Sequence, residues 1–394
     1  MQELESHIRV ANIIEDGRMA GPQNRMIMVA SVPNKKIITK IIFPKKNSDD
    51  FEKLCKKFGI DYLPLSLTTM SSNWISIIKY LILFPYEILI LFFALKKNHF
   101  DLVHISGGCW QFKGVLAAKL ANKKVVWHLN DTHAPFFIRK AFSLISPLAN
   151  CFIFASERTR QYYKNFVPQK TKNFLIQSPV DINFFDPKLK YNVEEFQKKF
   201  LKKNKIIIGT VGNINPNKGH STFLDAVMYL SSYSNEILFL IAGPVYKSQK
   251  KYFENLKNII RRENMKNVYF LDSKTDVRPL LSIIDIYVCS SDNEASPLSV
   301  WEAMSMEKAV ISTDVGDVGK FINDGTNGLI VKKGDARALA DNIIKLIERP
   351  ELRKEFGKSA RLIAKNQLDL NLCVNLHTLV YKKTYLDDTE SVSL

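Results

Sequence analysis

The sequence has few cysteines, and their spacing fits neither a disulfide framework nor a metal site. Five occur in 394 residues, and no two are spaced as metal ligands are. An odd number of cysteines, mostly inside apolar segments, is typical of reduced and buried thiols, so we expect a cytoplasmic protein. The cysteines are Cys55, Cys109, Cys151, Cys289 and Cys373.

Long uninterrupted apolar runs are also lacking. The first residues do not combine a basic segment with an apolar one, so we expect no secretory signal. The most apolar stretch, residues 74–95, approaches the length of a membrane span but contains Lys79, Pro85 and Glu87. Two interpretations of it stay open: a buried pair of helices, or a helix whose apolar face touches a membrane surface.

Acidic residues are too few to balance the basic ones, and the formal net charge is +17. In residues 1–200, Lys and Arg minus Asp and Glu is 29 minus 16, or +13; the remainder gives 27 minus 23, or +4. Such asymmetry suits an anionic partner of the first half, such as membrane lipid, a phosphorylated carrier or nucleic acid.

Short apolar, β-branched segments alternate with longer helical patterns. Near-continuous apolar runs of this kind are typical of parallel strands covered on both faces. Strands are expected over 8–14, 35–43, 101–106, 123–129, 150–156 and 172–178, and then over 206–212, 237–243, 267–272, 283–291, 308–314 and 327–335. Helices are expected over 110–122, 250–263, 297–306 and 336–348.

A charged segment without a strand pattern interrupts this alternation at residues 186–205. The pattern therefore predicts an α/β protein of two doubly wound, Rossmann-like domains that face each other across a cleft. The domains are predicted over 1–185 and 206–370, with 186–205 as the linker. Residues 371–394 are interpreted as a helix or tail that packs back on the first domain.

Ligands of open parallel sheets bind beyond the carboxyl ends of the strands, where loops lead into helices. In the loop within 209–226, Lys218 stands where a helix opens. Helix-start amides and a lysine form an anion site, usually for phosphate. A capped helix with an exposed lysine is the competing interpretation. Neither a P-loop nor a G-x-G-x-x-G fingerprint is present.

A second loop places two glutamates beside a helix start. Ser296 is predicted to be the N-cap and Pro297 the first helical residue, which aims the positive helix end into the cleft. Glu294 precedes the helix and Glu302 follows about two turns in. Carboxylates beside an anion site act as acceptors, suited to the hydroxyls of a ligand that also carries phosphate. A nucleotide sugar is such a ligand.

Residues 283–331 resemble the signature region of glycosyltransferase family 4, the retaining glycosyltransferases with the GT-B fold. The E-x7-E pair of that family corresponds to Glu294 and Glu302. The resemblance covers almost the whole chain and includes the segments "DLVHISG" (101–107), "SPVDINFFDP" (178–187), "IAGPVY" (241–246) and "VYFLD" (268–272).

The resemblance implies a role for each matching residue. Glu302 is expected to accept hydrogen bonds from the ribose hydroxyls, Glu294 from hydroxyls of the transferred sugar, and Lys218 is expected to pair with the diphosphate leaving group. Gly21 lies in a segment that resembles the loop closing over the phosphates. The other residues expected to hold the donor are Gly243, Leu271 and Asp272, and the backbone amides of Ala295, Ser296, Pro297 and Leu298.

Two positions depart from the family pattern. Asn213 stands where the family often has an arginine, whose part Arg25 or the helix end would take. Asn130 stands where many members have a histidine that contacts the donor sugar. His128 shares a strand face with Asn130, so it either replaces that histidine or is structural.

Two other histidines carry weaker expectations. His104 is interpreted as structural or acceptor-side, and His220 as a residue of a helix start.

The activity implied is transfer of a sugar from a nucleotide-diphosphate sugar to an acceptor hydroxyl, with retention at the anomeric carbon. No Asp-x-Asp pair occurs, so we expect neither a metal nor another cofactor. The basic first half and the apolar stretch 74–95 favour a lipid-linked saccharide, or a lipopolysaccharide, capsule or O-antigen precursor, met at the inner face of the cytoplasmic membrane.

Three alternatives remain: a non-catalytic nucleotide-sugar-binding relative, a nucleotide-sugar epimerase of the same architecture, and a nucleic-acid-binding protein. The last is disfavoured, because the basic residues are dispersed and no basic-aromatic module is present.

Overall fold

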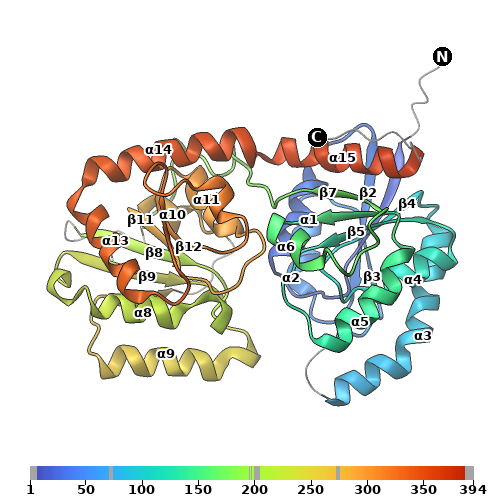
Figure 1. Ribbon diagram of the computed structural model, residues 1–394, viewed down its shortest axis with the longest axis horizontal. Helices are drawn as coiled ribbons and strands as arrows, with labels where there is room; N and C mark the ends of the chain where they lie inside the picture. The colour runs from blue at the N-terminus through green and yellow to red at the C-terminus, as the bar shows by residue number, and fades with distance from the viewer. Residues whose placement is uncertain are drawn as a thin grey trace. The chain divides into compact units, whose positions relative to one another are not determined.

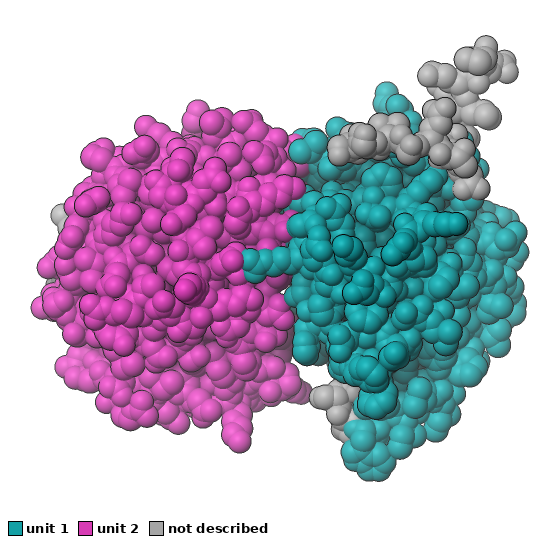
Figure 2. Space-filling model, viewed as in Figure 1, with its two compact units in different colours: residues 1–178, 370–394 teal, residues 179–369 magenta. Residues whose placement is uncertain are grey.

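The structure is a computed structural model that describes residues 7–70, 74–194, 196, 198, 205–271 and 276–386. The chain forms two compact units, coloured separately in Figure 2. Unit 1 comprises Met1–Ser178 and Leu370–Leu394, and unit 2 comprises Pro179–Asp369.

Unit 1 is built on a seven-stranded parallel sheet in the order β3-β2-β1-β4-β5-β6-β7. All six strands expected in this part of the chain are present, and β3 is an edge strand that the sequence pattern did not predict. The strands are β1 (Ile8–Ile13), β2 (Ile37–Pro44), β3 (Tyr62–Leu65), β4 (Leu102–Ile105), β5 (Lys124–Leu129), β6 (Cys151–Phe154) and β7 (Lys172–Leu175).

Helices cover both faces of this sheet, as Figure 1 shows. Alternate residues of β5 explain why its sequence is apolar throughout: Val125 and Trp127 pack with α3, α4 and α5, whereas Val126 packs on the side of α1 and α15. The helices are α1 (Gly21–Ser31), α2 (Asp49–Lys57), α3 (Trp74–Lys97), α4 (Phe112–Leu120), α5 (Phe136–Ile145), α6 (Glu157–Tyr163) and α15 (Leu370–Leu386).

The apolar stretch 74–95 forms one continuous helix, α3, with Pro85 inside it. The expected alternative of a helix pair is therefore wrong. Only 17% of the most apolar 18-residue window of α3 is buried, although its length and composition would allow it to cross a membrane. Burial inside the protein does not account for its apolar character.

Unit 2 contains a six-stranded parallel sheet in the order β10-β9-β8-β11-β12-β13. Every strand expected here is present: β8 (Ile206–Val211), β9 (Ile237–Ala242), β10 (Val268–Leu271), β11 (Ile286–Cys289), β12 (Ala309–Thr313) and β13 (Leu329–Val331). The helices are α8 (His220–Met228), α9 (Lys250–Arg262), α10 (Arg278–Ile283), α11 (Leu298–Ser305), α12 (Val318–Phe321), α13 (Ala336–Glu348) and α14 (Pro350–Gln367).

Residues 179–185, expected in the first domain, belong to unit 2. The Val180 amide donates to the Leu368 carbonyl, and the buried Phe185 accepts a 2.7 Å hydrogen bond from Ser305 Oγ on its carbonyl oxygen. At the other end, α15 joins unit 1, where Tyr381 and Val380 enter its core.

Candidate functional site

The strand order reverses between β1 and β4 in unit 1 and between β8 and β11 in unit 2. The loops that leave two neighbouring strands at such a point run to opposite faces of the sheet, which opens a crevice at the carboxyl ends. In unit 2, Lys218 follows β8 and Glu294 follows β11. Topology therefore brings together two residues that lie 76 positions apart in sequence.

Lys218 and Glu294 form an ion pair at this point. Lys218 Nζ donates to Glu294 Oε1 at 2.5 Å, and the side chains are 25% and 17% exposed. Burial alone would lower the pKa of Lys218, but the Glu294 carboxylate outweighs burial and raises it. Ser291 Oγ donates to the same Glu294 oxygen at 3.1 Å, so the carboxylate has a fixed position.

Glycines allow the loops around this pair to approach each other closely. Gly219 has φ +61° and caps α8, and a Cβ there would collide with the backbone of Ser290. Ser290 Oγ in turn donates to the Lys218 carbonyl at 3.0 Å. A side chain at Gly243 would likewise collide with the backbone of Gly212. These contacts hold the loop of Lys218 against the loop of Glu294.

The start of α11 differs from the expectation by one residue. Pro297, not Ser296, is the N-cap, and Leu298 is the first helical residue. The predicted capping by Ser296 is therefore wrong; its hydroxyl accepts a 3.2 Å hydrogen bond from Trp301 Nε1. Pro297 has no amide hydrogen, so of the expected amide donors only Ala295, Ser296 and Leu298 can serve.

Glu302 lies on α11, half-buried, near the charge of Lys218. Burial raises the pKa of Glu302 to about 7, although Lys218 acts to lower it. A carboxylate with this pKa is only partly ionised at neutral pH. A ligand that donates hydrogen bonds to it would favour the ionised form.

The remaining expected residues of unit 2 border the same loops. Asn213 follows β8, and its carbonyl accepts a 3.1 Å hydrogen bond from Asn215 Nδ2. Gly243 follows β9, and Leu271 is the last residue of β10. Asp272 lies outside the described residues. His220 is the first residue of α8, which confirms the expectation for it.

In unit 1, Arg25 is the centre of a polar cluster that the sequence did not reveal. The buried guanidinium bonds His128 Nε2 at 2.6 Å, Asn130 Oδ1 at 2.5 Å and Ser106 Oγ at 3.2 Å. Among the described residues no carboxylate pairs with it, and burial lowers the pKa of Arg25 to about 10. Because Arg25 engages the amide oxygen of Asn130, the buried Asn130 Nδ2 is left as a donor without a partner.

His128 and Asn130 therefore lie on one side of the sheet, as expected from their spacing. His128 has no exposed surface, however, and its ring is occupied by Arg25. Gly21 is the first residue of α1, and a Cβ there would meet nothing within 4 Å. No contact in the described structure therefore requires a glycine at this position, and its part in a phosphate loop stays a prediction.

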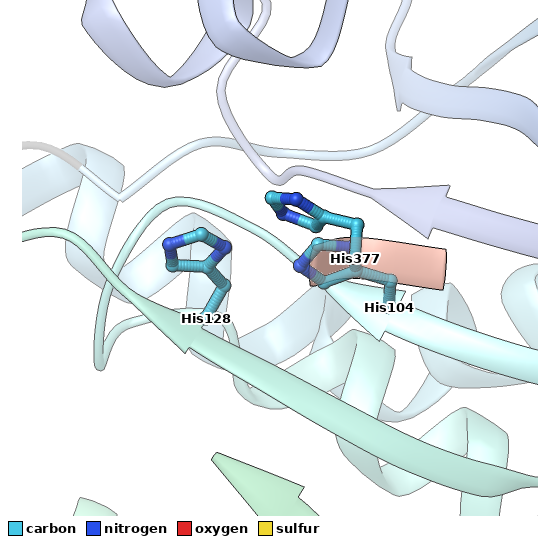
Figure 3. A group of neighbouring side chains, drawn as sticks. All are labelled: His104, His128 and His377. Carbon is cyan, nitrogen blue, oxygen red and sulfur yellow. The ribbon is translucent and has the colours of Figure 1, made fainter. Parts of the chain in front are cut away.

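Three imidazoles, His104, His128 and His377, lie together beside Arg25, with ligand nitrogens within 4.8 Å of one another (Figure 3). His104 Nδ1 is 2.7 Å from Tyr381 Oη, and His377 Nδ1 is 2.9 Å from the Cys373 carbonyl. Burial lowers the pKa of all three rings.

This histidine cluster does not fit a divalent metal. Arg25 only donates, so His128 Nε2 is an acceptor and its Nδ1 carries the proton of the neutral ring. Binding a cation through Nδ1 would require an imidazolate, next to a buried guanidinium. The cluster instead connects α15 to the sheet, which agrees with the structural interpretation of His104. His377 is a member of the cluster that the sequence did not predict.

Comparison with known proteins shows which families this chain is similar to. Residues 192–363 match the model of the family "Glycosyl transferases group 1". Among curated proteins, the N,N'-diacetylbacillosaminyl-diphospho-undecaprenol alpha-1,3-N-acetylgalactosaminyltransferase of Campylobacter jejuni is 24% identical over 382 residues, which cover 91% of this chain and 94% of that protein.

Solved structures share the fold over nearly the whole chain. A glycosyltransferase from Rickettsia africae superposes with a TM-score of 0.81 at 21% identity, covering 97% of this chain and all of the other. Anabaena HepE in complex with UDP and glucose gives a TM-score of 0.83 at 17% identity and covers 95% of this chain. The two Rossmann-like sheets are thus those of the GT-B fold.

Proposed function

We propose that this chain, a glycosyltransferase with the GT-B fold, is a retaining, metal-independent enzyme of the glycosyl transferases group 1 that uses a nucleotide-diphosphate sugar. The observation that carries the proposal is the pair of Lys218 and Glu294 at the point where the strand order of unit 2 reverses. A cation and a fixed carboxylate 2.5 Å apart can hold a diphosphate and a sugar hydroxyl side by side.

Lys218 supplies the charge that the departing diphosphate needs. Glu294 neutralises the positive charge of Lys218 in the ion pair. A donor diphosphate would take over the ammonium and free Glu294 to accept hydrogen bonds from the transferred sugar. Stabilising the negative charge that develops on the leaving group lowers the barrier of the transfer step.

Glu302 and the backbone amides hold the rest of the donor. Ionised Glu302 accepts hydrogen bonds from the ribose hydroxyls, and the amides of Ala295, Ser296 and Leu298 donate to the sugar and diphosphate. Gly243 follows β9 and Leu271 ends β10, so both lie at strand ends next to the Lys218 loop, where they border the nucleotide. Asn213 adds no charge, so Lys218 and the start of α11 carry the phosphate contact in unit 2.

In unit 1, we assign the donor contact to Asn130 rather than to His128. Both Asn130 Nδ2 and His128 Nδ1 lack a partner, but Asn130 is partly exposed, whereas the His128 ring has no exposed surface and accepts from Arg25. His128 and Arg25 thus act as positioning residues for the Asn130 amide. The leaving phosphate itself takes the proton of the acceptor hydroxyl. The new glycosidic bond forms on the same face of the sugar from which the phosphate departs. This accounts for retention.

The acceptor is a lipid-linked saccharide or a related envelope-polysaccharide precursor, met by a peripheral enzyme at the inner face of the cytoplasmic membrane. The Campylobacter relative, by its name, acts on an undecaprenol-linked acceptor. The basic excess of the first 200 residues suits a diphosphate-linked lipid in an anionic membrane.

The test is release of nucleotide from UDP-, GDP- and ADP-sugars, with and without a membrane lipid extract. Wild type is compared with Lys218→Ala, Glu294→Ala and the control Lys358→Ala, which alters an exposed lysine of α14. Extract-dependent release of one nucleotide, lost in the first two variants only, supports the proposal, and NMR of the product reports retention. Release from no donor, or isomerised donor without acceptor, would refute it.

A further inference from the structure

Helix α3 presents its apolar side chains to the outside. Six exposed positions follow one another at intervals of four and three residues, so they form one stripe of the helix. They are Trp74, Ile78, Ile82, Tyr86, Leu89 and Phe93, and Ile75, Ile77 and Leu81 are exposed as well. A surface helix of a globular protein normally points such a stripe at the core, so the exposure of this one requires another explanation.

The opposite side of α3 faces the protein and carries two buried polar residues, Tyr80 and Glu87, beside apolar ones. Glu87 is buried and accepts from Lys113 Nζ of α4 at 2.6 Å and from the Thr68 amide at 2.7 Å. Tyr80, also buried, donates to Glu15 at 3.3 Å, and Lys113 Nζ lies 4.0 Å from the Tyr80 ring centroid. The polar face of this helix is thus already used inside unit 1.

This network prevents α3 from crossing a membrane. Withdrawal of the helix would remove Glu87 from Lys113, which has no exposed surface, and leave this buried charge with only the more distant Glu15 carboxylate, at 3.8 Å. It would also expose Leu91 and Leu95, which have no accessible surface in the core. The helix therefore stays in unit 1 with its apolar stripe outward.

Helix α5 also carries exposed apolar residues, and it packs on the same core cluster of unit 1 as α3 and α4 do. Phe136, Phe137 and Leu144 of α5 are exposed, at 56%, 81% and 81%. We call these three and the six residues of the α3 stripe the α3–α5 face.

The exposed charges of these two helices have one sign. Lys79, Lys96 and Lys97 on α3 and Lys140 on α5 are exposed, whereas the single acidic residue of the two helices, Glu87, is buried. A second copy of this chain would bring the same lysines against each other. An anionic surface with an apolar interior complements both the lysines and the stripe.

We propose that the α3–α5 face binds the surface of an anionic lipid bilayer, with α3 lying in the plane of the interface. A helix of 24 residues is about 36 Å long. Its apolar stripe enters the acyl boundary, while the lysines contact lipid phosphates. This inference rests on the proposed function and deepens it, because it names the surface at which the enzyme meets a lipid-linked acceptor.

Vesicle flotation tests the proposal without any catalytic readout. The probes are vesicles of phosphatidylcholine alone and of phosphatidylcholine mixed with phosphatidylglycerol. The test variant is Ile82→Asp/Phe137→Asp, two highly exposed positions of the α3–α5 face. Leu362→Asp on α14, 59% exposed, is the matched control in unit 2. Lys218→Ala is included, since it removes activity but leaves the face intact.

The wild type is expected to float with anionic vesicles and, at raised salt, less so. The double variant should bind these vesicles at least about tenfold more weakly. The Leu362→Asp and Lys218→Ala proteins should bind them as tightly as wild type does. Equal binding to neutral vesicles, or unchanged flotation of the double variant, would overturn the proposal. A dimeric wild type and a monomeric double variant would also overturn the proposal, because the face would then bind a second copy of the chain. Flotation by a protein that releases no nucleotide would count against the proposed function alone.

Discussion

Lys218 Nζ and Glu294 Oε1 lie 2.5 Å apart, so the cation of the candidate site is neutralised by the carboxylate next to it. Each partner holds the other in position, at the ends of two adjacent strands. A diphosphate that binds there must exchange one anionic partner of Lys218 for another.

Replacing Lys218 by Ala should lower kcat by about 10²- to 10³-fold, because the charge on the leaving diphosphate loses its main stabilising partner. Glu294→Gln should mainly impair use of the sugar, since an amide accepts hydrogen bonds less well than a carboxylate. Initial-rate kinetics on the donor identified by nucleotide release measure both effects. Lys358→Ala is the control, and kinetics equal to wild type in Lys218→Ala would remove Lys218 from the site.

Gly219→Ala should destabilise unit 2 by more than Gly325→Ala. Both glycines have positive φ, +61° and +75°, so both substitutions cost about 1 kcal/mol of backbone strain. Only at Gly219 would the new Cβ also collide with the backbone of Ser290; at Gly325 nothing lies within 4 Å. Denaturant unfolding of the two variants measures the difference, and equal losses would show that the close approach of the loops has no energetic weight.

Acid should destabilise the protein through the histidine cluster of unit 1. The pKa of His377 is lowered to about 4, and those of His104 and His128 lie well below normal, so these rings stay neutral while unfolded histidines take up protons. Their contribution is present above about pH 6.5 and is lost as the pH falls below it, at up to about 1.4 kcal/mol per pH unit for each ring.

Unfolding free energies measured between pH 7 and pH 5 check this slope. His377→Gln should reduce it by about 1.4 kcal/mol per pH unit, and His133→Gln, at an exposed position, should leave it unchanged. An unaltered slope in His377→Gln would contradict the assignment.

Glu302→Gln should stabilise unit 2 relative to wild type at pH 8 and not at pH 5. The pKa of Glu302 is raised to about 7, so its favourable, protonated state is complete below the unfolded value near 4.5 and is lost as the pH rises through 7. The neutral amide avoids the cost of burying a charge. The melting temperature of the variant should exceed that of wild type by about 2–4 °C at the higher pH.

Nucleotide affinity should show the reverse trend. Wild type should bind UDP more tightly as the pH rises through 7 and the carboxylate ionises, whereas Glu302→Gln should bind weakly at every pH. Calorimetric titrations at pH 6 and pH 8 compare the two, with Glu351→Gln on the exposed surface as control. A pH dependence that persists in Glu302→Gln would place its origin elsewhere.

Lys113→Met should destabilise unit 1 by about 3–5 kcal/mol, because it leaves the buried carboxylates of Glu87 and Glu15 without their cation. Lys113→Met/Glu87→Leu should recover part of that loss, since Glu15 stays without its cation. Lys56→Met, which removes the exposed pair with Glu52, should cost less than about 1 kcal/mol. Denaturant unfolding compares the three, and a double variant no more stable than the single would show that the pair is not the source of the loss.

The sequence by itself determined the two parallel sheets and the place of the candidate site. Apolar runs covered on both faces, as in β5 and β9, leave little choice but a parallel sheet with helices on both sides. Lys218 and Glu294 lie in segments that follow strands, where the topology of such a sheet puts ligands, and Glu302 lies on the helix after Glu294. Local pattern was enough because these features depend on neighbours in sequence.

What only the tertiary structure decided depends on residues far apart in the chain. Arg25 meets His128 and Asn130 across more than a hundred positions, and no local pattern announces a buried guanidinium. Likewise, the pattern of residues 74–95 allowed a helix with an outward apolar face but did not show which face lies inside. The partner of Glu87 contributes to that: Lys113 holds Glu87 inward on the side that also buries Leu91, and the opposite apolar side is left outside because only one face of a helix can pack on a sheet.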